Sequence, residues 1–256
     1  MATAVPGKSI DLGSVISKAM DVLGKNAPGF LGVGLILSGV PAFLMQYLMM
    51  GMIASSTDPA SMGGAVILGL LLSILVMVVT AALLQGVLLR SAILHLGGRP
   101  ADIGGSVNSA MGMILPIIGL SIVVGLCVMF GFLLLIVPGV ILYVMFSVAI
   151  PVLVNERKGV FESISRSIEL TAGSRWIIFA LIVILFVLNW IIGMVFGLLG
   201  GIFTGMLGLT AGMALTTALS SAVSAAISAA VISSLYVELR TTKEGATTDG
   251  LAQVFA

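Results

Sequence analysis

The fold is decided by residues 137–176, which read VPGVILYVMFSVAIPVLVNERKGVFESISRSIELTAGSRW. The segment begins inside a charge-free apolar run and leaves that run at Asn155-Glu156-Arg157-Lys158. An amphipathic stretch follows, and a second apolar run begins at Trp176. This order predicts a membrane span that ends in charged residues, then a helix on the membrane surface, then a new span.

The composition of the whole chain agrees with this interpretation. Of its 256 residues, 59% are hydrophobic and 8% are charged, whereas soluble domains carry roughly 25% charged residues. A chain this apolar cannot cover itself with a polar surface, so we expect lipid to be its solvent. The formal net charge is only +1, so no basic surface for nucleic acid is expected.

Charge-free runs give the number of spans. A hydrocarbon core of about 30 Å requires about 20 apolar residues in a helix. Four runs meet this length, at residues 26–57, 59–89, 103–155 and 176–237. The last two runs are each long enough to cross twice. The predicted fold is therefore an all-α, polytopic integral membrane protein with six transmembrane helices.

The boundary between spans three and four has two candidate positions. A helix break at Pro138-Gly139 would start span four there, but only about 24 Å of helix then remains before Asn155. A turn near Gly131-Phe132 divides the run evenly and makes Pro138 a kink within span four. We favour the even division and keep Pro138 and Gly139 as the candidate helix break.

Two segments that precede spans one and five are predicted to be amphipathic helices in the membrane interface. They cover residues 9–26 and 160–171. Their apolar residues recur at helical spacing: Leu12, Val15, Ile16, Ala19 and Leu23 in the first, and Val160, Phe161, Ile164, Ile168 and Thr171 in the second. Asp21 with Lys25, and Glu162 and Glu169 with Arg166, lie at the spacing of helical ion pairs.

The two amphipathic segments also align with each other. Residues 16–22 match residues 164–170 class by class, and residues 102–111, before span three, match residues 11–20 at fewer positions. We infer three units, each an interfacial helix followed by a helical hairpin, at about 9–93, 101–155 and 159–237. Together they form one helical membrane domain over residues 1–240, and residues 241–256 form a polar C-terminal tail.

The basic residues indicate the orientation. All eleven Lys and Arg fall before span one, between spans two and three, between spans four and five, or after span six. The three opposite loops carry none. By the positive-inside rule, both termini are expected in the cytoplasm.

Residues 138–176 carry a resemblance to a known bacterial pattern. The matching residues are Pro138-Gly139-Val140-Ile141-Leu142, Phe146, Pro151, Val154-Asn155-Glu156, Gly159, Arg166-Ser167, Glu169-Leu170-Thr171, Gly173 and Arg175-Trp176. This pattern resembles the signature of the YciC-like proteins and of the related glycerophosphoryl diester phosphodiesterase membrane domain. The resemblance implies a multi-pass protein of the bacterial inner (plasma) membrane. It implies the membrane module only, because the chain has one His and too little soluble sequence for a catalytic barrel.

A search for chemistry predicts no catalytic, cofactor-binding or metal site. No G-x-S-x-G or H-E-x-x-H motif occurs, and Cys127 is the only cysteine. An intramembrane enzyme would require the single histidine, His95, to meet an acid or a nucleophile in a pocket. We expect Gln46, Gln85 and Asn189 to form interhelical hydrogen bonds. The small residues Ser220, Ser224, Ser228, Ala218, Ala222, Ala226 and Ala230 are expected to pack helices closely.

The candidate functional residues flank the second amphipathic segment. They are Arg157, Lys158, Arg166, Glu169 and Arg175, and their expected contacts are anionic lipid headgroups or an unknown protein partner. The function predicted from these features is a non-enzymatic membrane module that supports the organisation of envelope lipid or protein. The alternative is a permease or lipid-handling transporter for a small or amphiphilic substrate. A polar, water-accessible cavity at mid-membrane would favour the transporter, and a tightly packed bundle would favour the module.

Overall fold

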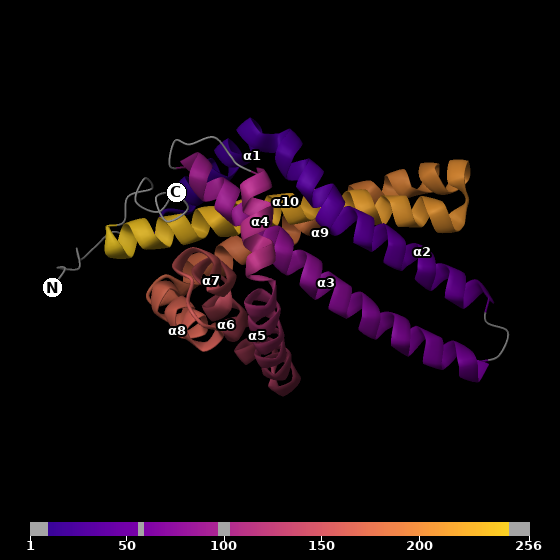
Figure 1. Cartoon of the computed structure of the whole chain (residues 1–256), viewed down its shortest axis with the longest axis horizontal. Helices are drawn as coiled ribbons and strands as arrows, with labels where there is room; N and C mark the ends of the chain where they lie inside the picture. Colours follow the sequence, from indigo (N-terminus) through magenta and orange to yellow (C-terminus); the bar gives the residue numbers. More distant parts are fainter. Residues whose placement is uncertain (1–9, 56–58, 97–102, 246–256) are drawn as a thin grey trace.

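The computed structural model describes residues 10–55, 59–96 and 103–245, and over these residues every element is helical (Figure 1). Within them, six segments are long and apolar enough to cross a membrane: Leu12–Met52, Val66–Leu96, Ile114–Leu134, Ile136–Glu156, Arg175–Leu207 and Leu209–Glu244. The prediction of an all-α chain with six segments long and apolar enough to span a membrane is confirmed for the described residues.

The first apolar segment is bent twice. Helix α1 (Leu12–Gly34) begins at Asp11, whose carboxylate accepts hydrogen bonds from the backbone N–H groups of Gly13 and Ser14. It kinks at Asn26, and continues through the π-helix η1 (Leu35–Gly39) into α2 (Val40–Ser55). Pro41 lies in the first turn of α2. Because proline has no N–H and its ring crowds the preceding turn, the wider π turn before it accommodates the ring.

Helix α10 (Leu209–Glu244) is the central element of the bundle. It packs against α9 (Arg175–Leu207), α1, η1, α2 and α3 (Pro59–Leu96), and Figure 1 shows it beside α9. The two helices join at Gly208, whose φ of 82° suits glycine. Asn189 Nδ2 of α9 donates to Ser228 Oγ of α10 at 3.4 Å, so the interhelical hydrogen bond expected of Asn189 is confirmed.

Small residues let α1 and η1 approach α10 closely. Ala218, Ala222, Ala226 and Ala230 are all buried on α10. A Cβ atom added to Gly34 would lie 2.7 Å from the carbonyl oxygen of Ala222. A Cβ added to Gly39 would lie 2.9 Å from that of Ala218. The expected close packing along this face is confirmed, and backbone against backbone leaves no room for larger residues.

The third and fourth apolar segments divide differently from the prediction. Helix α5 (Ile114–Leu134) and helix α6 (Ile136–Phe146) meet at Leu135, which is extended at φ −164°, ψ 156°. The favoured turn at Gly131-Phe132 is therefore wrong. Pro138 and Gly139 lie in the first turn of α6 and neither break nor kink it. The physical reason is that proline fits a first helical turn, where its missing N–H is not needed.

A second break follows α6. Ser147 and Val148 separate α6 from the short helix α7 (Ala149–Glu156), and α8 (Val160–Thr171) comes next. Helix α4 (Ile103–Gly112) precedes α5. Helix α10 continues to Glu244, so the first residues of the predicted polar tail 241–256 are helical. The rest of that tail, from residue 246, lies outside the described residues, as do residues 101–102 of the predicted second unit.

Substitution of two glycines of α1 tests the close packing. Gly34→Ala should destabilise the protein by about 1–3 kcal/mol, because its methyl group meets the Ala222 backbone. Gly32→Ala is the matched control: a Cβ there meets nothing within 4 Å, and alanine favours the helix by about 1 kcal/mol over glycine. Thermal unfolding in detergent should therefore give opposite shifts for the two variants. Equal shifts would show that Gly34 is not at a close contact.

Candidate functional site

The predicted site residues gather where α7, α8, α9 and α10 meet. Helix α7 ends at Glu156, and Arg157 follows in the left-handed conformation at φ 50°, ψ 37°. Gly159 starts α8, and its N–H donates to the Glu162 carboxylate at 3.4 Å. The left-handed residue turns the chain sharply between α7 and α8. The side chain of Arg157 consequently lies exposed at the turn.

Glu156 is the centre of an ion-pair network, although its side chain is only 11% exposed. Its Oε2 forms an ion pair with Lys158 Nζ at 3.1 Å and accepts a hydrogen bond from Arg166 Nε at 3.3 Å. Its Oε1 accepts from Arg240 Nη1 at 3.4 Å. One carboxylate therefore joins the end of α7 to α8 and α10. Such charges remain stable at a partly buried position because each has an opposite partner.

Tyr236 and Asn155 extend this network into the bundle. The Tyr236 hydroxyl accepts from Asn155 Nδ2 at 2.7 Å and from Arg240 Nη1 at 3.2 Å, and donates to Glu156 Oε1 at 3.2 Å. These three contacts use the full hydrogen-bonding capacity of a phenol. Both Asn155 and Tyr236 are buried, so their polar groups require these partners. We call Asn155, Glu156, Lys158, Arg166, Tyr236, Arg240 and Glu244 the Glu156 network.

Arg166 is held inside this network. Besides Glu156 it pairs with Glu169, Nη1 to Oε2 at 3.5 Å, and with Glu244 through Nη2. Glu244 also accepts from Arg240 Nε at 2.7 Å. Arg166 therefore connects α7, α8 and α10, a role that its predicted contact with headgroups did not include. The pairing with Glu244 joins residues far apart in sequence, which no local spacing rule could indicate.

The other predicted residues separate into two kinds. Lys158 is paired with Glu156, and Glu169 lies at the exposed edge of the network. Arg157 and Arg175 are exposed, and within the described part of the chain no carboxylate pairs with either. Lys243 contacts the same region differently: its ammonium donates to the carbonyl oxygens of Glu169, at 2.9 Å, and Ala172 at the end of α8. A cation suits carbonyl oxygens at the C-terminal end of a helix.

The face of α8 that packs on the protein carries small hydroxyl residues. Ser163, Ser167 and Thr171 are buried, whereas Phe161 is 76% exposed. The hydroxyl of Ser167 donates to the carbonyl oxygen of Met145 in α6 at 2.7 Å. The small hydroxyl residues thus face the bundle and satisfy backbone groups there. Leu170 is buried on the same helix, so α8 packs on the bundle through hydroxyl and apolar groups together.

A second cluster joins α1 to α10 and α3. Glu238 of α10 accepts from Lys18 and, at 3.1 Å, from the Ser14 hydroxyl. Asp21 pairs with Lys25 at 2.8 Å, as its spacing predicted, and also with His95 Nε2 at 3.1 Å. Sequence reasoning missed both Glu238 and the contact between Asp21 and His95. The aligned cations Lys18 and Arg166 each pair with a glutamate of α10.

His95 therefore meets an acid, which is one part of the requirement for catalysis. Among the described residues, Asp21 is the one polar contact of His95. The same carboxylate also pairs with Lys25. No hydroxyl or thiol of these residues lies in hydrogen-bond reach of the imidazole, as a nucleophile would. Nor do three His, Cys, Asp or Glu side chains of the described residues gather as metal ligands.

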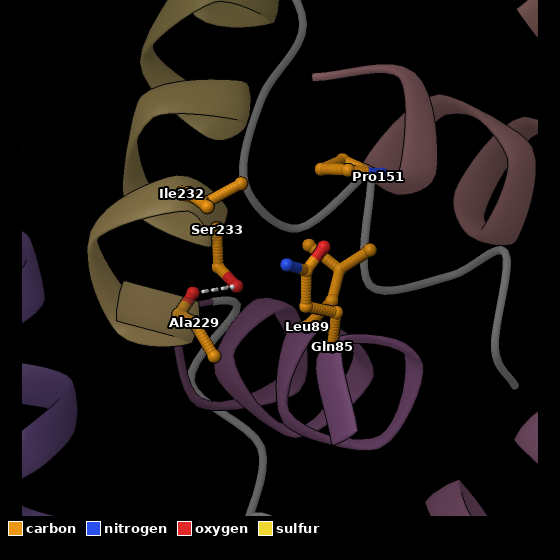
Figure 2. Close-up of a pocket in the computed structure, with 6 residues that line it drawn as sticks. All are labelled: Gln85, Leu89, Pro151, Ala229, Ile232 and Ser233. Carbon is orange, nitrogen blue, oxygen red and sulfur yellow. Dashed lines mark hydrogen bonds between the residues drawn. The ribbon is translucent and has the colours of Figure 1, made fainter. Parts of the chain in front are cut away.

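A small pocket lies between α3, α7 and α10. Its lining residues are Gln85, Leu89, Pro151, Ala229, Ile232 and Ser233 (Figure 2). The Ser233 hydroxyl donates a hydrogen bond to the carbonyl oxygen of Ala229 at 2.6 Å. The space leaves essentially no room even for a water molecule, whereas typical ligand sites measure roughly 300–1,000 Å³. This pocket is therefore too small to indicate a substrate.

Comparison with known proteins adds no relative: no protein-family model, no curated protein and no solved structure matches the chain. The arrangement of the site is accordingly interpreted from its own contacts.

Neutralising Glu156 tests the network. Glu156→Gln keeps the shape of the side chain but leaves Lys158, Arg166 and Arg240 short of a shared carboxylate. We expect a loss of about 3 kcal/mol in the free energy of unfolding, the cost of breaking a largely buried pair. Glu169→Gln is the control, because its side chain is 64% exposed and such pairs contribute about 0–1 kcal/mol. Equal stability of the two variants would refute the central role of Glu156.

Proposed function

We propose that this protein is a non-enzymatic, multi-pass module of the bacterial inner membrane that binds anionic lipid headgroups through the face formed by α8 and the start of α9. Both termini are placed on the cytoplasmic side of the membrane. The lipid bilayer is its principal partner, and organisation of lipid or of neighbouring proteins is the function that follows.

The observation that supports this proposal is that some basic residues around α8 are paired with carboxylates and others are not. Arg166 and Arg240 are neutralised by Glu156 and Glu244. Arg157 and Arg175, at the two ends of α8, are exposed and unpaired among the described residues. The paired set stabilises the fold, and the unpaired set leaves two guanidinium groups for an external anion. Arginine suits phosphate because its planar group can donate two hydrogen bonds in parallel.

Aromatic residues beside these arginines support a position at the lipid surface. Trp176 follows Arg175 and is 84% exposed, with its ring edge-on to Phe179 at 6.1 Å between centroids. Phe161 lies exposed on the first turn of α8. Tryptophan and other aromatic residues collect at the boundary between headgroups and hydrocarbon. Exposed cations next to exposed aromatic rings therefore favour a headgroup-level placement of α8.

The resemblance of residues 138–176 to the YciC-like and glycerophosphoryl diester phosphodiesterase membrane-domain pattern belongs to this proposal. Its residues include Asn155, Glu156 and Arg166, which the Glu156 network uses to join helices. The pattern is thus explained by the construction of a membrane module. The phosphodiesterase activity in the family name is not extended to this chain.

Transport is the second function considered, and the packing of the described residues favours it less. The pocket at Gln85 is small, and the serines of α10 are partly used in helix contacts, as at Ser228 with Asn189. Close contact of α10 with Gly34 and Gly39 leaves no space along that face. A tightly packed bundle is what the module requires.

Titration with phosphatidylglycerol and phosphatidylcholine tests the proposal. Native mass spectrometry of the detergent-released protein should show preferential binding of phosphatidylglycerol. Arg157→Gln with Arg175→Gln should weaken that binding about thirtyfold, because each basic residue near an anionic surface contributes about 1 kcal/mol. Binding of phosphatidylcholine should not change.

Arg157→Lys with Arg175→Lys is the matched control. It keeps both charges and should keep most of the affinity for phosphatidylglycerol. Equal affinity of wild type and the glutamine variant for this lipid would refute the proposed headgroup site.

A further inference from the structure

The connection between α5 and α6 lacks the polar residues that are usual in a loop exposed to water. From residue 122 to residue 142 the chain contains no charged residue and no Ser, Thr, Asn or Gln. Loops in water are normally built from polar residues, glycine and proline. The connection between α2 and α3 follows that rule, since it carries Ser55, Ser56, Thr57 and Asp58. The connection between α5 and α6 lacks the composition of a loop in water.

The side chains at the tip of this hairpin point outward. Leu133, Leu134, Leu135, Ile136 and Val137 are 77%, 75%, 70%, 73% and 66% exposed. Five consecutive exposed apolar residues would be strongly unfavourable in water. They need an apolar environment, and no element of the described chain supplies it.

The backbone of the tip is adapted to a medium without water. The Leu135 N–H donates to the carbonyl oxygen of Gly131 at 3.1 Å, and the Leu135 carbonyl accepts from the Gly139 N–H at 3.4 Å. Pro138 has no N–H to satisfy. The number of unpaired backbone groups at the turn is thereby reduced, which matters most in hydrocarbon. Gly131 and Gly139 permit the close turn, since a Cβ on Gly131 would lie 2.9 Å from Gly139 Cα.

The segment Ile136–Glu156 is long enough to cross only if α6 and α7 are counted together, and α6 alone is too short. Helix α6 has 11 residues, about 16 Å of helix. Its C-terminal end is fixed at the charged face, because Ser167 and Thr171 of α8 donate to the carbonyl oxygen of Met145 at 2.7 and 3.5 Å. After the break at Ser147-Val148, α7 does not extend α6 but lies buried in the bundle. About 16 Å is roughly half of a 30 Å hydrocarbon core.

The part of helix α5 that projects beyond its contact with α8 is also shorter than a full membrane span. Its first part is anchored near α8: Ile117 and Leu120 are buried, and a Cβ on Gly119 would lie 3.7 Å from Val160 Cγ2. Residues 121–134 then project for about 21 Å. In Figure 1 the hairpin of α5 and α6 points away from the direction in which α2, α3, α9 and α10 extend. Reaches of about 16 and 21 Å are both shorter than a hydrocarbon core of about 30 Å.

We propose that α5 and α6 form a re-entrant hairpin whose tip, Leu133 to Val137, ends among the acyl chains of the bilayer. The pair enters and leaves through the leaflet in which α8 lies. A re-entrant pair and a pair of spans begin and end on the same side, so the distribution of Lys and Arg is identical for both. The hairpin therefore adds apolar volume to one leaflet, and four of the six apolar segments cross the membrane.

Cysteine accessibility tests this inference in the full-length protein in native membrane vesicles. In a Cys127→Ala background, Leu135→Cys places a thiol at the tip and Ser55→Cys places one at the end of α2. Both vesicle orientations are treated with a membrane-impermeant maleimide. Ser55→Cys should react in one orientation. Leu135→Cys should react at least about tenfold more slowly in both, because a thiol in hydrocarbon forms little thiolate.

A nitroxide attached at Leu135→Cys gives an independent readout. Its relaxation should respond to oxygen, which dissolves in hydrocarbon, and hardly at all to a water-soluble nickel complex. Reaction of Leu135→Cys with the maleimide at the rate of Ser55→Cys, or strong relaxation by the nickel complex, would overturn the proposal. Leu135 is exposed, so neither result depends on a change in folding.

Discussion

An ionised side chain in hydrocarbon is costly, and this cost organises the whole molecule. Helix α10 illustrates it: from Leu209 to Val237 the helix carries no charge, and then Glu238, Arg240, Lys243 and Glu244 follow within its last turns. Each of these four residues contacts another helix or a neighbouring charge. The charged end of one central helix thus becomes the place where the surrounding elements are joined.

Helix α10 is held to its neighbours by two kinds of contact. Through the apolar part, alanines and facing glycines bring backbones together, and dispersion contacts between them stabilise the bundle. At the charged end, Glu238 holds α1 through Lys18, while Arg240 and Glu244 hold α7 and α8 through Glu156 and Arg166. The two amphipathic segments that align in sequence are attached to the same helix by the same kind of ion pair. This arrangement holds α8 at the charged end of α10, with the unpaired Arg157 and Arg175 at the two ends of α8.

Apolar length and charge placement were sufficient to predict the helical architecture. Helices α3, α9 and α10 follow directly from uninterrupted apolar runs, and the pair of Asp21 and Lys25 follows from helical spacing. The turn at Leu135 was mispredicted because no polar residue marks it, and Pro138 had two interpretations that sequence could not separate. Pairings such as Arg166 with Glu244 depend on tertiary packing.

The central claim is that all basic segments lie on one side of the membrane, and side-specific labelling of single cysteines measures it directly. Lys25 lies in α1 just before the charge-free run that begins at residue 26, and its side chain is 65% exposed, while Arg175 is exposed at the start of α9. Lys25→Cys and Arg175→Cys, each in a Cys127→Ala background, should react with an impermeant maleimide only in inside-out vesicles. Reaction of these two cysteines from opposite sides of the membrane would contradict the account.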